Sequence, residues 1–138
     1  MARSLEARLN SNWPVALAVF RVMFGLLFLS HGLSTVFGWP ADHTVPVDEW
    51  PGYYAGLIEL VTGLLITAGL FTRAAAFVAS GEMAFAYFTV HLPHHLSSID
   101  DAFPINNDGE ASVMYCFAFL LLVFAGGGAY ALDDRKRR

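Results

Sequence analysis

The sequence predicts an all-α integral membrane protein, a bundle of four membrane-spanning helices with both termini in the cytoplasm. Three observations favour this fold class. Hydrophobic residues make up 56% of the chain and charged residues only 14%, whereas a soluble domain carries about 25% charged residues. The apolar residues gather in four long runs. Outside these runs, arginine and lysine occur only at the two ends of the chain and between the second and third runs.

The first run predicts a helix from about residue 15 to residue 37, after a cytoplasmic N-terminal segment over residues 1–14. Trp13 suits the headgroup interface, and Pro14 suits a first helical turn. The run continues for about 20 residues, longer than the roughly 7–15 residues of a signal-peptide core, and no A-x-A-like cleavage site accompanies it. We therefore expect a span that is retained in the mature chain.

The second and third runs predict helices over about 52–71 and 74–91. Prolines keep the preceding loop irregular, and Thr72-Arg73 is the only polar break between these two helices. A tight antiparallel hairpin is therefore expected here.

After an irregular segment over 92–109, the fourth run predicts a helix over 110–132, with Asn107 or Asp108 as its N-cap. Residues 133–138 form a charged tail. Runs of about 18–23 residues are long enough to cross a hydrocarbon core of about 30 Å. The transmembrane domain is therefore expected over 15–132.

The arginine and lysine distribution also predicts the orientation. Arg3, Arg8, Arg73 and the cluster over 135–138 mark one side of the membrane, and the two other loops carry neither residue. By the positive-inside rule that side is the cytoplasm, and a multi-pass protein of the inner (plasma) membrane is expected. The net charge of −4 and the lack of a basic face argue against a nucleic-acid partner.

Arg21 and Glu82 are charged residues inside apolar runs, at similar expected depths of about 9 and 12 Å from the cytoplasmic end. A neutralising ion pair that sets the register of the helices is one interpretation, because a lone charge at this depth is costly. A proton or anion path is the alternative.

His31 and Glu59 fall together in the outer half, each about 9–10 Å deep. A carboxylate beside an imidazole orients the ring and can pass a proton to a reducible oxygen such as a quinone carbonyl. The alternative is a histidine that only satisfies a structural hydrogen bond. His91 and Glu110 are further candidates for the same outer site. Glu110 also suits the start of a helix.

His91, His94 and His95 have the spacing of residues that share a helix face, so they are candidate metal ligands. Pro93 disturbs that face, and no cysteine or carboxylate cluster supports the site. The single cysteine, Cys116, rules out a disulfide within the chain.

The chain resembles the DoxX family of small bacterial membrane proteins over about residues 15–133. The matching elements are Arg21 with His31-Gly32, the segment from Glu59 to Arg73, Asn107-Asp-Gly-Glu110, and Tyr130-Ala-Leu-Asp133. The resemblance implies a four-helix membrane bundle. One branch of the family is similar to the small quinone-linked subunit of thiosulfate:quinone oxidoreductase, and another is associated with membrane oxidoreductase complexes.

Three hypotheses of function follow. The first is a redox-associated membrane subunit that binds a quinone or similar amphiphile near His31 and Glu59, with membrane or membrane-associated redox proteins as partners. The second is a non-catalytic scaffold or assembly subunit. The third is transport of a small solute or metal, for which a homo-oligomer would be needed. The sequence carries no flavin, haem or nicotinamide motif.

Overall fold

The computed structural model describes residues 2–94 and 98–135, and within these residues the regular structure is helical, with no strand. The all-α fold predicted from the sequence is confirmed. The principal helices are α1 (Ala2–Phe37), α2 (Gly52–Ala68), α3 (Thr72–Ala86) and α5 (Glu110–Ala125). The shorter elements are a π-helical turn η1 (Tyr87–His91), α4 (Leu92–His94), a 3-10 turn η2 (Ile99–Ala102) and α6 (Leu132–Arg135).

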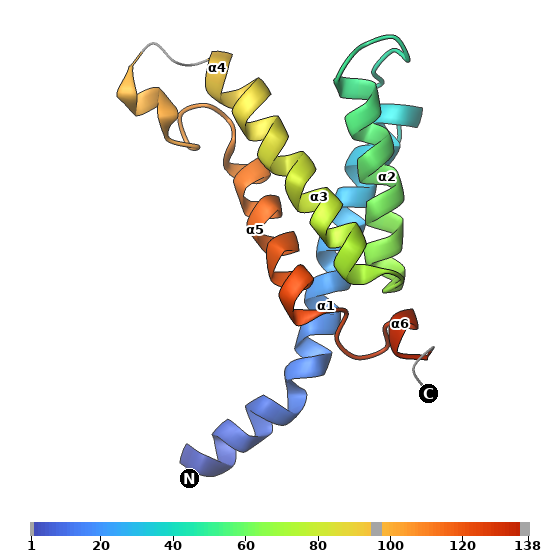
Figure 1. The fold of residues 1–138 in the computed structure, drawn as a ribbon, viewed down its shortest axis with the longest axis vertical. Coiled ribbons are helices and arrows are strands. Elements are labelled where there is room, and N and C mark those ends of the chain that lie inside the picture. Colours follow the sequence, from blue (N-terminus) through green and yellow to red (C-terminus); the bar gives the residue numbers. More distant parts are fainter. Residues whose placement is uncertain (1, 95–97, 136–138) are drawn as a thin grey trace.

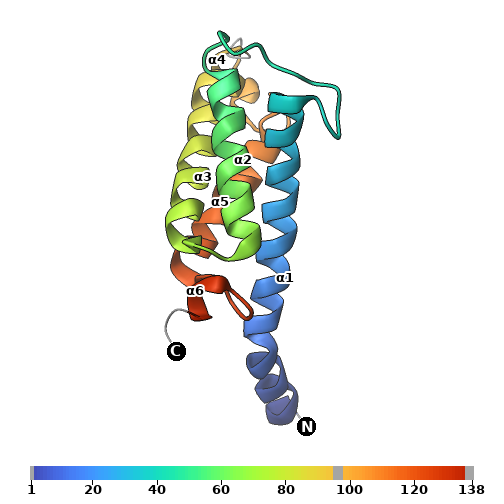
Figure 2. The same ribbon diagram turned by 90° about the vertical axis from the view of Figure 1, so that its right-hand side faces the viewer.

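The four principal helices form two closely packed pairs, α1 with α2 and α3 with α5. Figure 1 shows the α3–α5 pair leaning away from the α1–α2 pair toward the end that carries the long loops. The start of α1, the α2–α3 turn and α6 all lie at the opposite end, as Figure 2 also shows. The backbones of α1 and α5 rarely approach each other, and these two helices meet through large aromatic side chains.

Glycines allow α1 and α2 to pack with their backbones almost in contact. A Cβ atom added at Gly63 of α2 would lie 2.6 Å from the backbone nitrogen of Leu29 on α1. One added at Gly25 would lie 2.8 Å from the backbone nitrogen of Thr67. Small residues that permit this approach are typical of helix interfaces in membranes. The two helices are therefore held in one antiparallel register, with residue 25 opposite residue 67.

The core lies where the two helix pairs meet. Phe28 of α1 and Phe119 of α5 are fully buried, with ring centroids 4.7 Å apart in an edge-to-face arrangement. Ile66 and Leu122 complete the fully buried apolar group, and small alanines of α3 let the neighbouring helices approach. Polar side chains near this core are consequently held at defined depths.

The helix expected over 74–91 is observed as α3 (Thr72–Ala86), followed by the π-helical turn η1. Three other helix boundaries differ from those expected, each for a local reason. Helix α1 begins at Ala2 instead of about residue 15, because Pro14 is accommodated inside the helix. Helix α2 ends at Ala68 instead of residue 71, since Gly69 adopts a left-handed conformation with φ 71°. Helix α5 ends at Ala125 instead of residue 132, because Gly126 has φ 82°, a backbone conformation that favours glycine.

Helix α1 is the one described helix long and apolar enough to cross a membrane, over Ser4–Phe37. Helices α2 and α5 are apolar but shorter. Large apolar side chains are exposed along the outer faces of the bundle, among them Met23, Val61, Phe77 and Phe117. Such an apolar exterior is what a bilayer would cover.

Candidate functional site

Glu59 and Glu82 are two ionisable residues near the middle of neighbouring helices of the bundle. Glu59 lies on α2 and Glu82 on α3, and they are close enough for their charges to interact. Both side chains are half-buried. The Oε2 atom of Glu82 is fully buried and has no hydrogen-bond partner among the described residues. A buried oxygen without a partner costs free energy, which makes it a candidate position for a ligand.

Tyr115 of α5 joins this carboxylate pair and was missed by the sequence reasoning. Its ring stacks on Phe119 with centroids 5.8 Å apart, and its phenol group lies within range of the charge of Glu59. A signal was available, since Tyr115 carries a hydroxyl group inside an apolar, phenylalanine-rich helix. A buried tyrosine hydroxyl usually needs a hydrogen-bond partner.

His31 lies at the rim of the site, where its side chain is exposed. Its ring meets the ring of Tyr115 edge-on, with centroids 5.9 Å apart. No hydrogen bond or ion pair joins His31 to Glu59 in the described structure, although the α1–α2 register places the two residues at similar heights. Tyr115 contacts the histidine and interacts with the glutamate, so it links the two residues that the sequence analysis had paired directly.

The two other candidates of the outer site lie apart from the carboxylates. His91 is about 13 Å further along the helix than Glu82, and its Nδ1 atom is 3.2 Å from the carbonyl oxygen of Asn107. Glu110 is exposed in the first turn of α5. Asn107 is fully buried, and its Oδ1 atom accepts a hydrogen bond from the backbone N–H of Gly109. His91 therefore holds the loop before α5 in place.

The candidate metal ligands are only partly within the described structure. His95 lies outside the described residues, and the side chain of His94 is also outside the described part. Elsewhere in the described residues, no group of three His, Cys, Asp or Glu side chains is placed to hold a metal ion. The metal site stays a prediction.

Arg21 is placed differently from the expected ion pair with Glu82. Its guanidinium donates hydrogen bonds to the carbonyl oxygens of Ile66 at 2.9 Å, Thr67 at 2.7 Å and Gly127 at 2.8 Å. Glu82 lies ten residues into α3, about 15 Å from the end where these carbonyls lie. The two residues are therefore at different depths, and Arg21 neutralises the C-terminal end of α2 instead.

A cavity of about 390 Å³ opens beside Glu82, between the start of α2 and the second half of α3. Its walls are almost entirely apolar, and Glu82 is the one ionisable carboxylate that lines it. The aromatic side chains on its walls are Trp50, Tyr54 and Phe85. An apolar pocket with one directed polar group is the usual form of a site for a small amphiphilic ligand.

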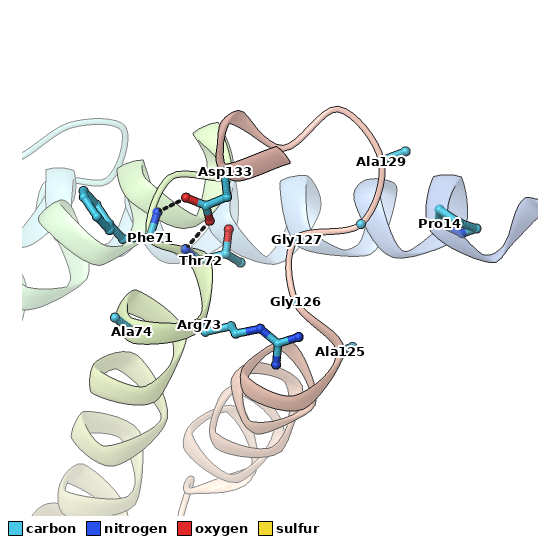
Figure 3. Close-up of a pocket in the computed structure, with 11 residues that line it drawn as sticks. Pro14, Phe71, Thr72, Arg73, Ala74, Ala125, Gly126, Gly127, Ala129 and Asp133 are labelled. Carbon is cyan, nitrogen blue, oxygen red and sulfur yellow. Dashed lines mark hydrogen bonds between the residues drawn. The ribbon is translucent and has the colours of Figure 1, made fainter. Parts of the chain in front are cut away.

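A second cavity, of about 660 Å³, lies at the opposite end of the bundle (Figure 3). Figure 3 shows the carboxylate of Asp133 accepting hydrogen bonds from the backbone N–H groups of Phe71 at 2.8 Å and Thr72 at 2.9 Å. Arg73 donates to the carbonyl oxygens of Val123 and Phe124 at the end of α5. Since these charged groups cap helix ends, we assign this cavity a structural role.

An all-helical bundle with an apolar exterior and half-buried carboxylates is typical of a helical membrane protein. The DoxX family model matches residues 16–92, and the chain belongs to the DoxX family. The resemblance noted from the sequence motifs is therefore confirmed.

The chain is also similar to proteins of three bacteria. An uncharacterized protein of Haemophilus influenzae is 39% identical over 125 residues, covering 88% of this chain and 91% of the relative. An uncharacterized membrane protein of Mycobacterium tuberculosis is 24% identical, over 97% of this chain and 89% of the relative. The protein named "Putative oxidoreductase CatD" of Bacillus subtilis is 24% identical, over 91% of this chain and 90% of the relative. No solved structure matches significantly.

Proposed function

We propose that this chain is a multi-pass subunit of the inner membrane that binds the headgroup of a quinone or similar amphiphile in the cavity beside Glu82. The observation that carries the proposal is that Glu82, whose Oε2 atom is buried without a partner among the described residues, is also one of the residues that line an otherwise apolar cavity. The sequence analysis expected the ligand near His31 and Glu59. The present proposal places it instead beside Glu82, between α2 and α3.

The chemistry of the cavity suits a ring that carries oxygen atoms. A protonated Glu82 can donate a hydrogen bond to a quinone carbonyl, and an ionised Glu82 can accept one from a hydroquinone hydroxyl. Trp50, Tyr54 and Phe85 supply aromatic surface against which the ring can stack. An isoprenoid tail would remain among lipid chains beside the exposed apolar faces of α2 and α3.

Glu59 and Tyr115 extend the site toward the α1–α5 face. The charges of Glu82 and Glu59 interact, Tyr115 lies within range of Glu59, and the ring of Tyr115 meets the exposed His31. We assign these four residues, in the order Glu82, Glu59, Tyr115 and His31, a role in passing protons between the cavity and the surface. Reduction of a quinone takes up two electrons and two protons; the electrons are assigned to a redox protein partner in or at the membrane. The oxidoreductase name of the Bacillus subtilis relative supports a redox setting.

Orientation is part of the same proposal. The described arginines outside the bundle core are Arg3 and Arg8 in the first part of α1, Arg73 at the start of α3 and Arg135 in α6, all in elements at the end that carries the α2–α3 turn. By the positive-inside rule this end faces the cytoplasm. The Glu82 cavity then opens in the outer half of the membrane.

The test is a titration of the purified chain in lipid nanodiscs with a short-tailed quinone, followed by quenching of tryptophan fluorescence. Trp50 lines the cavity, so a bound quinone ring should quench it. We expect saturable quenching, and Glu82→Gln should raise the Kd at least about tenfold, the effect of losing about 1.4 kcal/mol. Glu110→Gln, at an exposed helix start, is the matched control and should bind as the parent chain does.

Two outcomes would overturn the proposal. One is quenching that never saturates. The other is an unchanged Kd in Glu82→Gln in spite of normal folding, which would favour the scaffold interpretation. Tyr115→Phe keeps the packed ring and removes only the hydroxyl, so it should leave the Kd nearly unchanged and alter the pH dependence of quinone reduction by the intact complex. An unaltered pH profile would remove Tyr115 from the proton path.

A further inference from the structure

The first part of α1 continues well beyond the bundle. Every residue from 4 to 16 is exposed, and Leu17 is the first residue after them that is buried. Figure 2 shows this segment projecting past the α2–α3 turn and α6, with no other helix beside it. The exposed surface of this segment is therefore available to a partner.

The projecting segment is amphipathic. Leu5, Leu9 and Trp13 recur every fourth residue and so share one helix face, with exposed fractions of 60%, 64% and 54%. Arg8 and Asn10 lie outside this apolar stripe at helical spacing. A straight continuation of α1 into water would leave all three large apolar side chains solvated, which is unfavourable.

Pro14 supplies a point at which the segment can bend away from the membrane-crossing part of α1. Proline has no backbone N–H, so it cannot bond to the carbonyl of Asn10, and such a position kinks a helix. The bundle side of this point is anchored, because the carbonyl oxygen of Pro14 accepts a 2.8 Å hydrogen bond from the backbone N–H of Ala129. Figure 1 shows the segment at an angle to the rest of α1.

We propose that residues 2–13 form an interfacial helix that lies on an anionic lipid surface at the end of the bundle carrying the α2–α3 turn. Leu5, Leu9 and Trp13 enter the boundary between headgroups and acyl chains, where tryptophan is favoured. Arg8 faces the lipid phosphates, and Arg3 adds a second positive charge to the same sequence segment. We favour lipid over a protein partner because Trp13 is followed directly by the part of α1 that enters the bundle. The segment therefore begins where that part of α1 would meet the membrane surface.

The experiment uses the full chain in nanodiscs, with Trp39→Phe and Trp50→Phe so that Trp13 is the sole fluorophore. Discs contain either neutral lipid or a mixture with anionic phosphatidylglycerol, and quenching by iodide in water is compared with quenching by lipids brominated near the headgroup. We expect strong lipid quenching and weak iodide quenching in the anionic discs. Leu5→Ser with Leu9→Ser should raise iodide quenching at least threefold, whereas Asn10→Ser, off the apolar stripe, should leave it unchanged.

Arg8→Gln tests the electrostatic part separately, and it should reduce the difference between anionic and neutral discs. Equal iodide access to Trp13 in both lipids and in all variants would overturn the proposal. Protection of Trp13 that appears only with two chains in each disc would overturn it as well, because it would show that a second copy covers the stripe. Circular dichroism of each variant verifies that the bundle is intact.

Discussion

The guanidinium of Arg21 on α1 donates a 2.9 Å hydrogen bond to the carbonyl oxygen of Ile66 near the end of α2. With the bonds to Thr67 and Gly127, this side chain joins α1, α2 and the loop after α5. Arg21 is 2% exposed, so its charge is held by groups that are themselves fixed in the fold. A buried cation is thereby compensated through helix-end carbonyls.

Arg21→Met should lower the free energy of unfolding by about 3–5 kcal/mol, because it leaves buried carbonyl oxygens without donors. Arg21→Lys should lower the free energy of unfolding by less than Arg21→Met does, because the charge is kept. It should still be less stable than the parent chain, since an ammonium group cannot reproduce the forked geometry of the guanidinium. Reversible unfolding in detergent measures these values. The matched control is Arg73→Met: Arg73 also caps a helix end but is exposed, so its loss should cost about 1 kcal/mol or less. Equal losses in the two variants would contradict the assigned role.

Gly32→Ala should separate α1 from α2. A Cβ atom at Gly32 would lie 2.7 Å from the Cα atom of Leu60, so the helices must move apart, at about 1–3 kcal/mol. Gly81→Ala is the control on the surface of α3, where no atom lies within 4 Å of the added Cβ. That change should be neutral or stabilise by about 0.5–1 kcal/mol through helix propensity. Thermal unfolding of both variants tests the difference, and a loss of stability in Gly81→Ala would show that this face is covered in the membrane.

Glu82→Leu should raise the stability of the ligand-free chain by about 1–2 kcal/mol, because it removes a buried oxygen that has no partner and a charge beside Glu59. The same substitution should abolish saturable quinone binding. Such a gain in stability with loss of binding is typical of a functional site. If Glu82→Leu instead destabilises the chain, Glu82 has a structural partner, and the scaffold interpretation gains support.

Asp133→Ala should lower the unfolding free energy by about 1–2 kcal/mol. The Asp133 carboxylate caps the positive end of α3 through the backbone N–H groups of Phe71 and Thr72. Asp42→Ala, in the exposed loop after α1, is a suitable control and should change stability by less than about 0.5 kcal/mol. Hydrogen exchange at the first amides of α3 reports the cap directly, and unaltered protection there would contradict it.

Residue types and their spacing were sufficient to predict the principal helices, but not which side chains of different helices meet. The four apolar runs predicted the four principal helices, and Glu59, Glu82 and His31 stood out as ionisable groups in apolar surroundings. The helix ends were harder to predict from the sequence, because Gly69 and Gly126 end helices through left-handed or otherwise unusual backbone conformations. Tyr115 was overlooked because its importance depends on neighbours from α1 and α2 rather than on its own helix.

The sequence by itself determined that this is a helical DoxX-family membrane protein with ionisable groups inside its helices, since hydrophobic runs and the solvent preference of side chains are local properties. Only the tertiary structure decided which groups meet. Depth along separate helices predicts height but not the direction in which a side chain points or the exact register. Close packing at glycines sets the register of α1 and α2. In the packed bundle Arg21 bonds to carbonyls at the end of α2, and His31 lies beside Tyr115.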